Sequence, residues 1–392
     1  MPQASRSAGA VLVGASAAQA SVAFVNFGLP AIGPELQDEF GLSLFELGAV
    51  LGAGLLGSGL ALLVAGVAVE RLGARRTLVA GTALGTVALV VAALSTTKGP
   101  LFGSLLVFGL GSAVVPVAGA GELFRVYPAG RRGWALGVRQ TAVPLGGTIA
   151  ALTFPGLYAL GGTRLTMLTT AVAVGATGAA FALVVGPSTP AARIPSPFRS
   201  IWRAPGMQRL LAVAACYIVV LQALLAYVVP AVREAGFSEL VAASAYFAIN
   251  IVAMGARIAW GQIADRGGGS RRVRTLVEIG VVSAVGSLLF AVALHGSALL
   301  VLAAAVLFGI GALGWNALVY VSAGERAAPE LAARSVAVAA TVVFLLSGVV
   351  TPVLGAVVDV AGWDALWLST TALAAAGALL AAGLRRPLEP AL

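Results

Sequence analysis

Apolar segments long enough to cross a lipid bilayer recur along the whole of this chain. A transmembrane helix needs about 20 mainly apolar residues to span a hydrocarbon core about 30 Å thick. Only 10% of the 392 residues are charged, whereas soluble domains carry about 25%. The sequence therefore predicts an all-α membrane protein with twelve transmembrane helices, at residues 9–32, 46–69, 77–96, 101–124, 134–158, 165–186, 208–230, 240–263, 275–294, 298–321, 335–358 and 365–384.

The first segment also has features of a cleavable signal peptide. Arg6 precedes an apolar stretch, and Ala18-Gln19-Ala20 resembles a cleavage site. The apolar run continues past Ala20 to Leu29, however, which favours an uncleaved first helix.

The distribution of basic residues predicts the orientation in the membrane, because cytoplasmic loops carry an excess of Lys and Arg. With twelve spans, one face receives only Lys98, Arg164 and Arg233. We therefore expect a multi-pass protein of a bacterial inner (plasma) membrane with both termini in the cytoplasm. The residues at the cytoplasmic face are Arg6, Arg71, Arg75, Arg76, Arg125, Arg131, Arg132, Arg193, Arg199, Arg203, Arg209, Arg266, Arg271, Arg272, Arg274, Arg326, Arg334, Arg385 and Arg386.

The net charge of +9 does not indicate nucleic-acid binding, because the basic residues form short clusters between apolar runs rather than one stripe. The longest connection, 187–206, contains prolines and arginines and separates six spans from six. We therefore divide the chain into an N-terminal six-helix half (1–186), a central cytoplasmic loop (187–206) and a C-terminal six-helix half (207–392).

A short motif at the end of the second span recurs at the end of the eighth. Both copies have the form Gly-x-x-x-acid-Arg, at residues 66–71 and 261–266, and the second lies 195 residues after the first. This offset is about half of the chain, so a duplicated six-helix unit explains it.

The first copy, read on to residue 76, resembles the signature of the major facilitator superfamily, Gly-x-x-x-Asp-Arg-x-Gly-x-Arg-Arg. That signature lies between helices two and three and is often echoed between helices eight and nine. The resemblance implies a secondary transporter that works as a monomer, with the bilayer and a small-molecule substrate as its partners. Glu70 stands where Asp is usual and keeps the carboxylate.

Charged residues in these motifs predict a cytoplasmic gate, because carboxylates at helix ends can pair with arginines in one conformation and separate in another. The alternative is that the arginines only anchor the topology. The predicted gate consists of Gly66, Glu70, Arg71, Gly73, Arg75, Arg76, Glu122, Arg125, Gly261, Asp265 and Arg266.

Two arginines lie within predicted spans, where a charge usually faces a cavity or a partner. Arg257 precedes Asp265 by eight residues, so it lies about 12 Å from the cytoplasmic end of its helix, near the depth at which transporters bind substrate. The pattern Arg257-x-x-x-Gly261-x-x-x-Asp265-Arg266 resembles helix eight of the oxalate–formate and monocarboxylate porters. In those proteins the arginine binds the substrate carboxylate. The alternative is a structural arginine bonded to backbone carbonyls or a helix end.

Arg139 opens the fifth span, about 10 Å beyond Arg132 if the chain is helical there. Helices five and eight face each other in the superfamily, which predicts that Arg139 and Arg257 reach one cavity. Arg139 could equally extend toward the cytoplasm. The other residues predicted to bind substrate are Asn250, Asn26, Gln140, Trp315, Asn316, Tyr217 and Gln222.

No Asp or Glu lies near the centre of a predicted span, which disfavours a proton-driven exporter of cations. We therefore predict secondary active transport of a small organic anion (a carboxylate) by alternating access, with Arg257 and Arg139 binding the anion. The alternative is a drug or metabolite efflux transporter of the same superfamily with a mainly apolar cavity. The chain has no P-loop, HExxH or nucleophile motif, and its one cysteine, Cys216, lies in an apolar run. We therefore expect no enzyme activity, no cofactor and no metal site.

Overall fold

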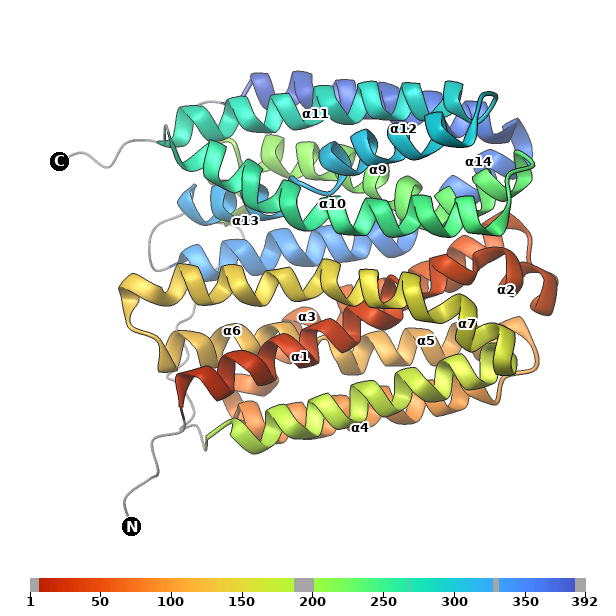
Figure 1. Ribbon diagram of the computed structural model, residues 1–392. Helices are drawn as coiled ribbons and strands as arrows, with labels where there is room; N and C mark the ends of the chain where they lie inside the picture. The colour runs from red at the N-terminus through yellow and green to blue at the C-terminus, as the bar shows by residue number, and fades with distance from the viewer. Residues whose placement is uncertain (1–6, 187–200, 267, 327–330, 385–392) are drawn as a thin grey trace, which may run out of the picture. The chain divides into compact units, whose positions relative to one another are not determined.

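The computed structural model describes residues 7–186, 201–266, 268–326 and 331–384, and all regular elements in these residues are helices (Figure 1). The elements are α1 (Ala8–Asn26), the 3₁₀ turn η1 (Leu29–Ile32), α2 (Gly33–Phe40), α3 (Leu44–Leu72), α4 (Ala74–Ala93), α5 (Lys98–Ser112), α6 (Val114–Val126), α7 (Ala129–Val184), α9 (Met207–Glu234), α10 (Glu239–Asp265), α11 (Gly268–Ala293), α12 (Ala298–Ala312), α13 (Asn316–Glu325) and α14 (Ala332–Ala382).

Ten helical segments of the described residues are long and apolar enough to cross a membrane. Two of them, α7 with 56 residues and α14 with 51, are each two helices joined at glycines. Gly162 has φ 62° and Gly362 has φ 81°, a backbone conformation that L-residues with a side chain rarely adopt. Counting α7 and α14 as two helices each gives the twelve predicted spans.

Three predicted helices differ from the structure. The span 101–124 is divided at Ala113 into α5 and α6, and the span 298–321 is divided at residues 313–315 into α12 and α13. The first span, predicted to continue to residue 32, ends as an α-helix at Asn26. Pro116 explains the first break in part, because it has no N–H to bond the carbonyl of Ser112.

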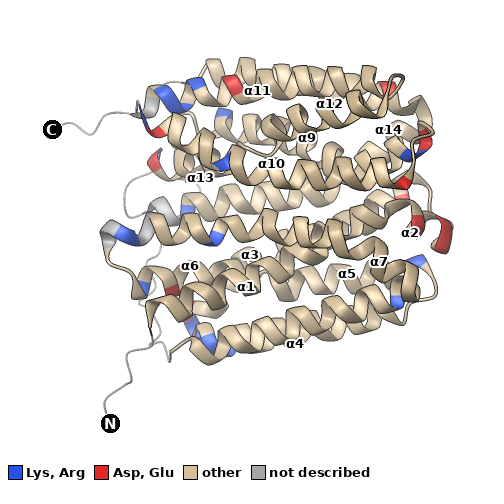
Figure 2. Ribbon diagram, in the orientation of Figure 1, with Lys and Arg blue, Asp and Glu red and all other residues tan. Residues whose placement is uncertain are grey.

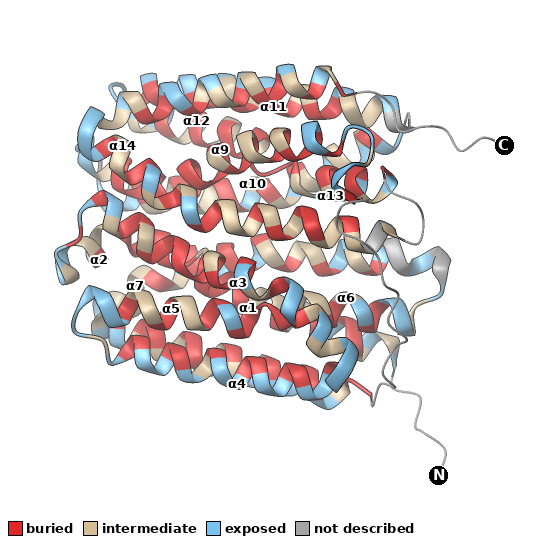
Figure 3. Ribbon diagram, turned by 180° about the vertical axis from the view of Figure 1, so that it is seen from behind, coloured by how far each residue is buried: buried red, intermediate tan, exposed pale blue. Residues whose placement is uncertain are grey.

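Charged residues gather toward the helix ends (Figure 2), and large apolar residues such as Val172 and Leu379 are 71% and 76% exposed. Buried residues form the helix faces that meet other helices of the same unit (Figure 3). This pattern suits lipid as the surrounding solvent, because the exposed apolar surface then lies against acyl chains.

Contacts divide the chain into two compact units, one of Met1–Ile32 with Ala53–Arg193 and one of Gly33–Gly52 with Ile194–Leu392. Within the predicted central loop, residues 187–200 lie outside the described residues. Residues 33–52 group with the second unit although the sequence prediction placed them in the N-terminal half.

Specific contacts hold residues 33–52 within the second unit. Asp359 of α14 accepts hydrogen bonds from the amides of Leu44 (3.2 Å) and Phe45 (2.9 Å), so it caps the first turn of α3. The Tyr227 hydroxyl of α9 donates to the carbonyl of Thr351 at 2.6 Å and lies 3.2 Å from the Leu44 carbonyl.

Glycine allows α3 and α14 to pack backbone against backbone. A Cβ at Gly48 would lie 2.6 Å from the Thr351 carbonyl oxygen, and one at Gly52 would lie 2.8 Å from the Gly348 carbonyl oxygen. Glycines four residues apart are a common device for close helix packing in membranes.

We expect the Gly48→Ala substitution to destabilise the purified protein, because the new methyl group meets backbone atoms of α14 that cannot move cheaply. Overpacking of this kind costs about 1–3 kcal/mol, which thermal unfolding followed by intrinsic fluorescence would detect. The control is Gly255→Ala in α10, where nothing lies within 4 Å of the added Cβ. Equal unfolding temperatures for the two variants would contradict the packing.

Candidate functional site

The fourth and tenth membrane spans are both broken just after the same four-residue pattern. Phe108-Gly-Leu-Gly111 precedes the break between α5 and α6, and Phe308-Gly-Ile-Gly311 precedes the break between α12 and α13. Each break leaves backbone carbonyls without their usual partners within the helix. In each unit, a buried or partly buried arginine from another helix bonds a carbonyl at or near the break.

In the second unit, two side chains of α10 bond the carbonyls at the end of α12. The Nε of Arg257 donates to the carbonyl of Leu313 at 3.1 Å, and the Nε1 of Trp260 donates to the carbonyl of Ile310 at 2.9 Å. Residues three apart share a helix face, so α10 presents both donors together. Gly314 leaves room for the indole, because a Cβ there would lie 2.9 Å from Trp260 Nε1.

Only one of the guanidinium nitrogens of Arg257 is used in this bond. Within the described residues, its two terminal nitrogens have no hydrogen bond or ion pair. Arginine carries five N–H donors in a fixed planar arrangement. The bond through Nε therefore fixes the side chain while the two terminal nitrogens remain available to a ligand.

Asn316 is the first residue of α13, three residues after Leu313, whose carbonyl binds Arg257. Its Oδ1 atom is buried and has no hydrogen-bond partner in the described part of the chain. Tyr320 follows four residues later, so the two side chains share one face of α13. The start of α13 therefore follows directly on the carbonyl that fixes the arginine.

In the first unit, Arg139 of α7 is 6% exposed. Its Nη1 donates to Gln19 Oε1 of α1 at 3.1 Å and lies 3.4 Å from the carbonyl of Pro116 in α6. Its Nε is buried without a hydrogen-bond partner in the described part of the chain. Gly119 of α6 lies against the guanidinium, since a Cβ there would be 3.3 Å from Nη1.

Three of the predicted substrate residues form bonds inside the second unit. The Tyr217 hydroxyl donates to the carbonyl of Leu276 at 2.6 Å, Gln222 Nε2 donates to Thr351 Oγ1 at 2.9 Å, and Asn250 Nδ2 donates to the carbonyl one turn earlier in its own helix. These bonds join or stabilise helices, so the three side chains have less capacity left for a ligand.

The remaining predicted substrate residues differ in burial. Trp315 is fully buried, with its ring 6.1 Å from that of Tyr217. Asn26 is buried and Gln140 is partly buried, and neither forms a hydrogen bond within the described residues. The structure does not place Arg139 and Arg257 relative to each other, because they belong to different units.

One predicted gate residue of the second unit, Asp265, belongs to a network of ion pairs. Arg272 of α11 pairs with Asp265 at 3.4 Å and with Glu325 at the end of α13, so it joins the ends of three helices. Arg266 is exposed.

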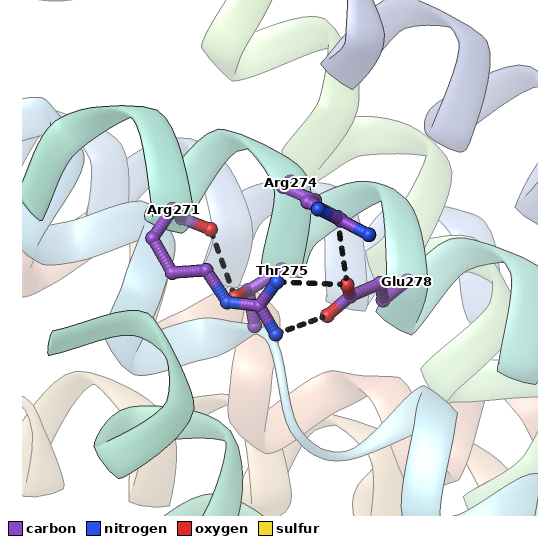
Figure 4. Close-up of polar contacts among 4 residues, drawn as sticks. All are labelled: Arg271, Arg274, Thr275 and Glu278. Carbon is purple, nitrogen blue, oxygen red and sulfur yellow. Dashed lines mark hydrogen bonds and ion pairs between the residues drawn. The ribbon is translucent and has the colours of Figure 1, made fainter. Parts of the chain in front are cut away.

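A second group lies on α11 itself. Arg271 bonds both carboxylate oxygens of Glu278 at 3.2 Å, and Arg274 lies 3.3 Å from the same carboxylate (Figure 4). Thr275 donates its hydroxyl to the Arg271 carbonyl at 2.9 Å. These residues, like Arg272 and Glu325, were not predicted from the sequence to belong to a site. One signal was present, because Ala120-Gly121-Glu122 recurs as Ala323-Gly324-Glu325.

In the first unit, the corresponding motif is arranged differently. Glu70, Arg71, Arg75 and Arg76 are exposed and form no ion pair within the described residues. A Cβ added at Gly66, or at Gly261 of the second motif, would have no neighbour within 4 Å. Gly73, with φ 85°, begins α4.

The acid of the fourth span has its own partner. Glu122, which is buried, pairs with Arg125 one turn later at 2.6 Å. Glu122, the acid that matches Glu325 in the repeat, therefore pairs within its own helix. Glu325 instead joins two helices in the second unit.

Comparisons with known proteins agree with this architecture. The family model described as Major Facilitator Superfamily matches residues 15–352. Among solved structures, a D-xylose–proton symporter is similar with a TM-score of 0.76 and 14% identity, over 96% of this chain and 98% of that one. A variant of the nucleoside transporter NupG is similar with a TM-score of 0.76 and 13% identity, over 96% of this chain and 100% of that one. No curated protein sequence matches this chain significantly.

We expect the Trp260→Phe substitution to lower the stability of the protein, because it leaves the partly buried Ile310 carbonyl without its donor at the break. Losing one partner of a buried hydrogen bond costs about 1–3 kcal/mol, which would appear as a lower unfolding temperature. Trp134→Phe is the matched control, since Trp134 is 61% exposed. A Trp260 variant as stable as this control would show that the indole does not support the break.

Proposed function

The chain belongs to the major facilitator superfamily, and from this premise we propose that it moves a small organic anion, a carboxylate, across the inner membrane by alternating access. A member of this superfamily is a multi-pass membrane protein and a secondary transporter of a small molecule, not an enzyme. The proposal concerns which small molecule is carried and which residues bind it.

The observation that carries the proposal is an uncompensated arginine within a membrane span of each unit. Neither Arg139 nor Arg257 has an acidic partner within the described residues; Arg139 is buried and Arg257 is partly buried. A buried charge costs several kcal/mol unless it is paired. An anionic ligand would supply the missing negative charge, and a carboxylate can accept two parallel hydrogen bonds from the terminal nitrogens of one guanidinium.

The break in the tenth span supports an anion at Arg257 for a second reason. The carbonyl end of α12, at Leu313, holds the arginine, and the amide end of α13 begins at Asn316. Helix N-termini attract anions because their N–H groups point outward and the helix dipole is positive there. Transporters of other folds also aim the N-termini of broken helices at anionic groups of their substrates.

The sequence around Arg257 supports a carboxylate in particular. Its pattern with Gly261, Asp265 and Arg266 is similar to helix eight of the oxalate–formate and monocarboxylate porters. We propose the same role for Arg257, and we propose Arg139 as the anion-binding residue of the first unit. Asn26 and Gln140 complete the candidate contacts in the first unit.

The charge clusters support a gating role at the cytoplasmic side. We propose that the Arg272 network with Asp265 and Glu325 holds the ends of α10, α11 and α13 together in one conformation. We also propose that the motif around Glu70, whose charges are unpaired within the described residues, finds its partners in another conformation.

We expect Arg257→Gln to abolish accumulation of carboxylates in proteoliposomes, because the neutral amide cannot compensate the anion. Arg257→Lys should retain partial activity, since it keeps the charge but loses the planar pair of donors. Uptake of a panel of radiolabelled mono- and dicarboxylates measures both.

The matched control for this experiment is Arg164→Gln, which removes an exposed arginine outside the site. Unchanged carboxylate uptake by Arg257→Gln would refute the site. Transport of neutral or cationic drugs without any carboxylate would refute the anion and favour the efflux alternative.

We expect both chain termini in the cytoplasm, because almost all loop arginines fall on that side. A fluorescent protein that folds only in the cytoplasm should fluoresce when fused to the C-terminus. Alkaline phosphatase inserted at Gly296, between α11 and α12, should be active because that loop lies outside. The reverse pair of signals would overturn the orientation.

A further inference from the structure

We propose that the carried anion is a hydroxycarboxylate, and that Asn316 selects its hydroxyl group. This inference rests on the proposed function, because it takes Arg257 as the group that binds the carboxylate. It adds the chemical class of the substrate and a residue that determines specificity.

The first observation is the buried amide of Asn316. Its Oδ1 atom has no hydrogen-bond partner within the described residues, and leaving a buried polar atom unpaired costs about 1–3 kcal/mol. Three other polar side chains predicted to bind substrate in this unit are engaged: Tyr217 with Leu276, Gln222 with Thr351, and Asn250 within its own helix. The Nε1 of Trp315 is also buried without a partner within the described residues, but it is a donor. Asn316 therefore offers a buried acceptor atom whose hydrogen-bonding capacity is unused.

The second observation is the position of Asn316 relative to Arg257. The guanidinium is fixed to the carbonyl of Leu313, three residues before Asn316. The bond to Leu313 therefore fixes the guanidinium close to the start of α13, which Asn316 opens.

The chemistry of the two groups defines the ligand. The terminal nitrogens of Arg257 are donors and need an anion, whereas Asn316 Oδ1 is an acceptor and needs a donor. A plain carboxylate has no donor to offer. A hydroxyl group has both a donor and acceptor sites, so it complements the amide whichever way the amide is turned.

A site built around such an acceptor discriminates strongly between ligands that carry the hydroxyl group and ligands that lack it. A ligand that lacks the hydroxyl leaves the buried amide unpaired, and this penalty is the reason that hydrogen-bonding sites reject the deoxy analogue. A pocket that merely had space for a hydroxyl would discriminate weakly. The size of the preference therefore tests whether Asn316 reads the hydroxyl.

The experiment compares matched pairs of ligands that differ by hydroxylation: lactate with propionate, 3-hydroxybutyrate with butyrate, and gluconate with hexanoate. Binding to the purified full-length protein in lipid nanodiscs is measured by titration calorimetry. For at least one pair, we expect the hydroxylated member to bind at least about tenfold more tightly. Asn316→Ala should reduce that preference to about twofold or less while plain carboxylates still bind. Gln208→Ala, which changes an exposed amide at the start of α9, should leave the preference unchanged.

The outcomes separate this inference from the proposed function. Equal binding within every pair by the unsubstituted protein would overturn the hydroxycarboxylate and leave the carboxylate proposal standing. A preference that survives in Asn316→Ala would overturn the role of Asn316. If none of the six compounds binds, the anion proposal fails, and this inference fails with it. The comparison within pairs needs no variant, so a poorly folded Asn316→Ala protein would not prevent the test.

Discussion

The need to satisfy every backbone carbonyl in lipid governs the centre of this protein. The hydrocarbon core offers no hydrogen bonds, so a helix can break there only where other groups bond the released carbonyls. At the break between α12 and α13, Arg257 and Trp260 supply those bonds. The structural alternative considered for Arg257, a bond to a helix end, is therefore real. It does not compete with binding an anion, because the bond uses Nε and leaves the terminal nitrogens.

Close packing through glycine is the second constraint, and it decides which segments belong together. The first turns of α3 lie against α14 because Gly48 and Gly52 have no side chains, and Asp359 caps the same end of α3. Residues 33–52 thus pack within the second unit, although the rest of that unit comes much later in the chain. A helix that begins in one unit and continues in the other couples them covalently.

The sequence predicted the spans well, because burial in lipid demands apolar runs of a defined length and runs of that length are easy to read. It did not predict the breaks at Ala113 and Leu313, since glycine and proline are common in transmembrane helices and seldom break them. Arg257 could be singled out as a charge within a span, but its partner, the Leu313 carbonyl, could not be predicted. The hydrogen bonds that Tyr217, Gln222 and Asn250 form within the fold could not be predicted. In helices that are apolar on all sides, the sequence does not show which face meets a neighbour. The Asp265–Arg272–Glu325 network could not be predicted either, because it forms between the ends of helices that are distant in the sequence.

The two arginines are not equivalents in the internal repeat, and this strengthens the interpretation of both. Arg139 lies on α7, in the fifth span of its half, whereas Arg257 lies on α10, in the second span of its half. A duplicated ancestral residue would occupy the same span in each half. Different helices instead supply a cation to the broken fourth span of each unit, at Pro116 and at Leu313. The break itself is therefore the common feature, because in each unit its carbonyls bind and orient a guanidinium. A positive charge placed in this way is held by the fold and still incompletely neutralised, which is what the proposed binding and release of an anion require.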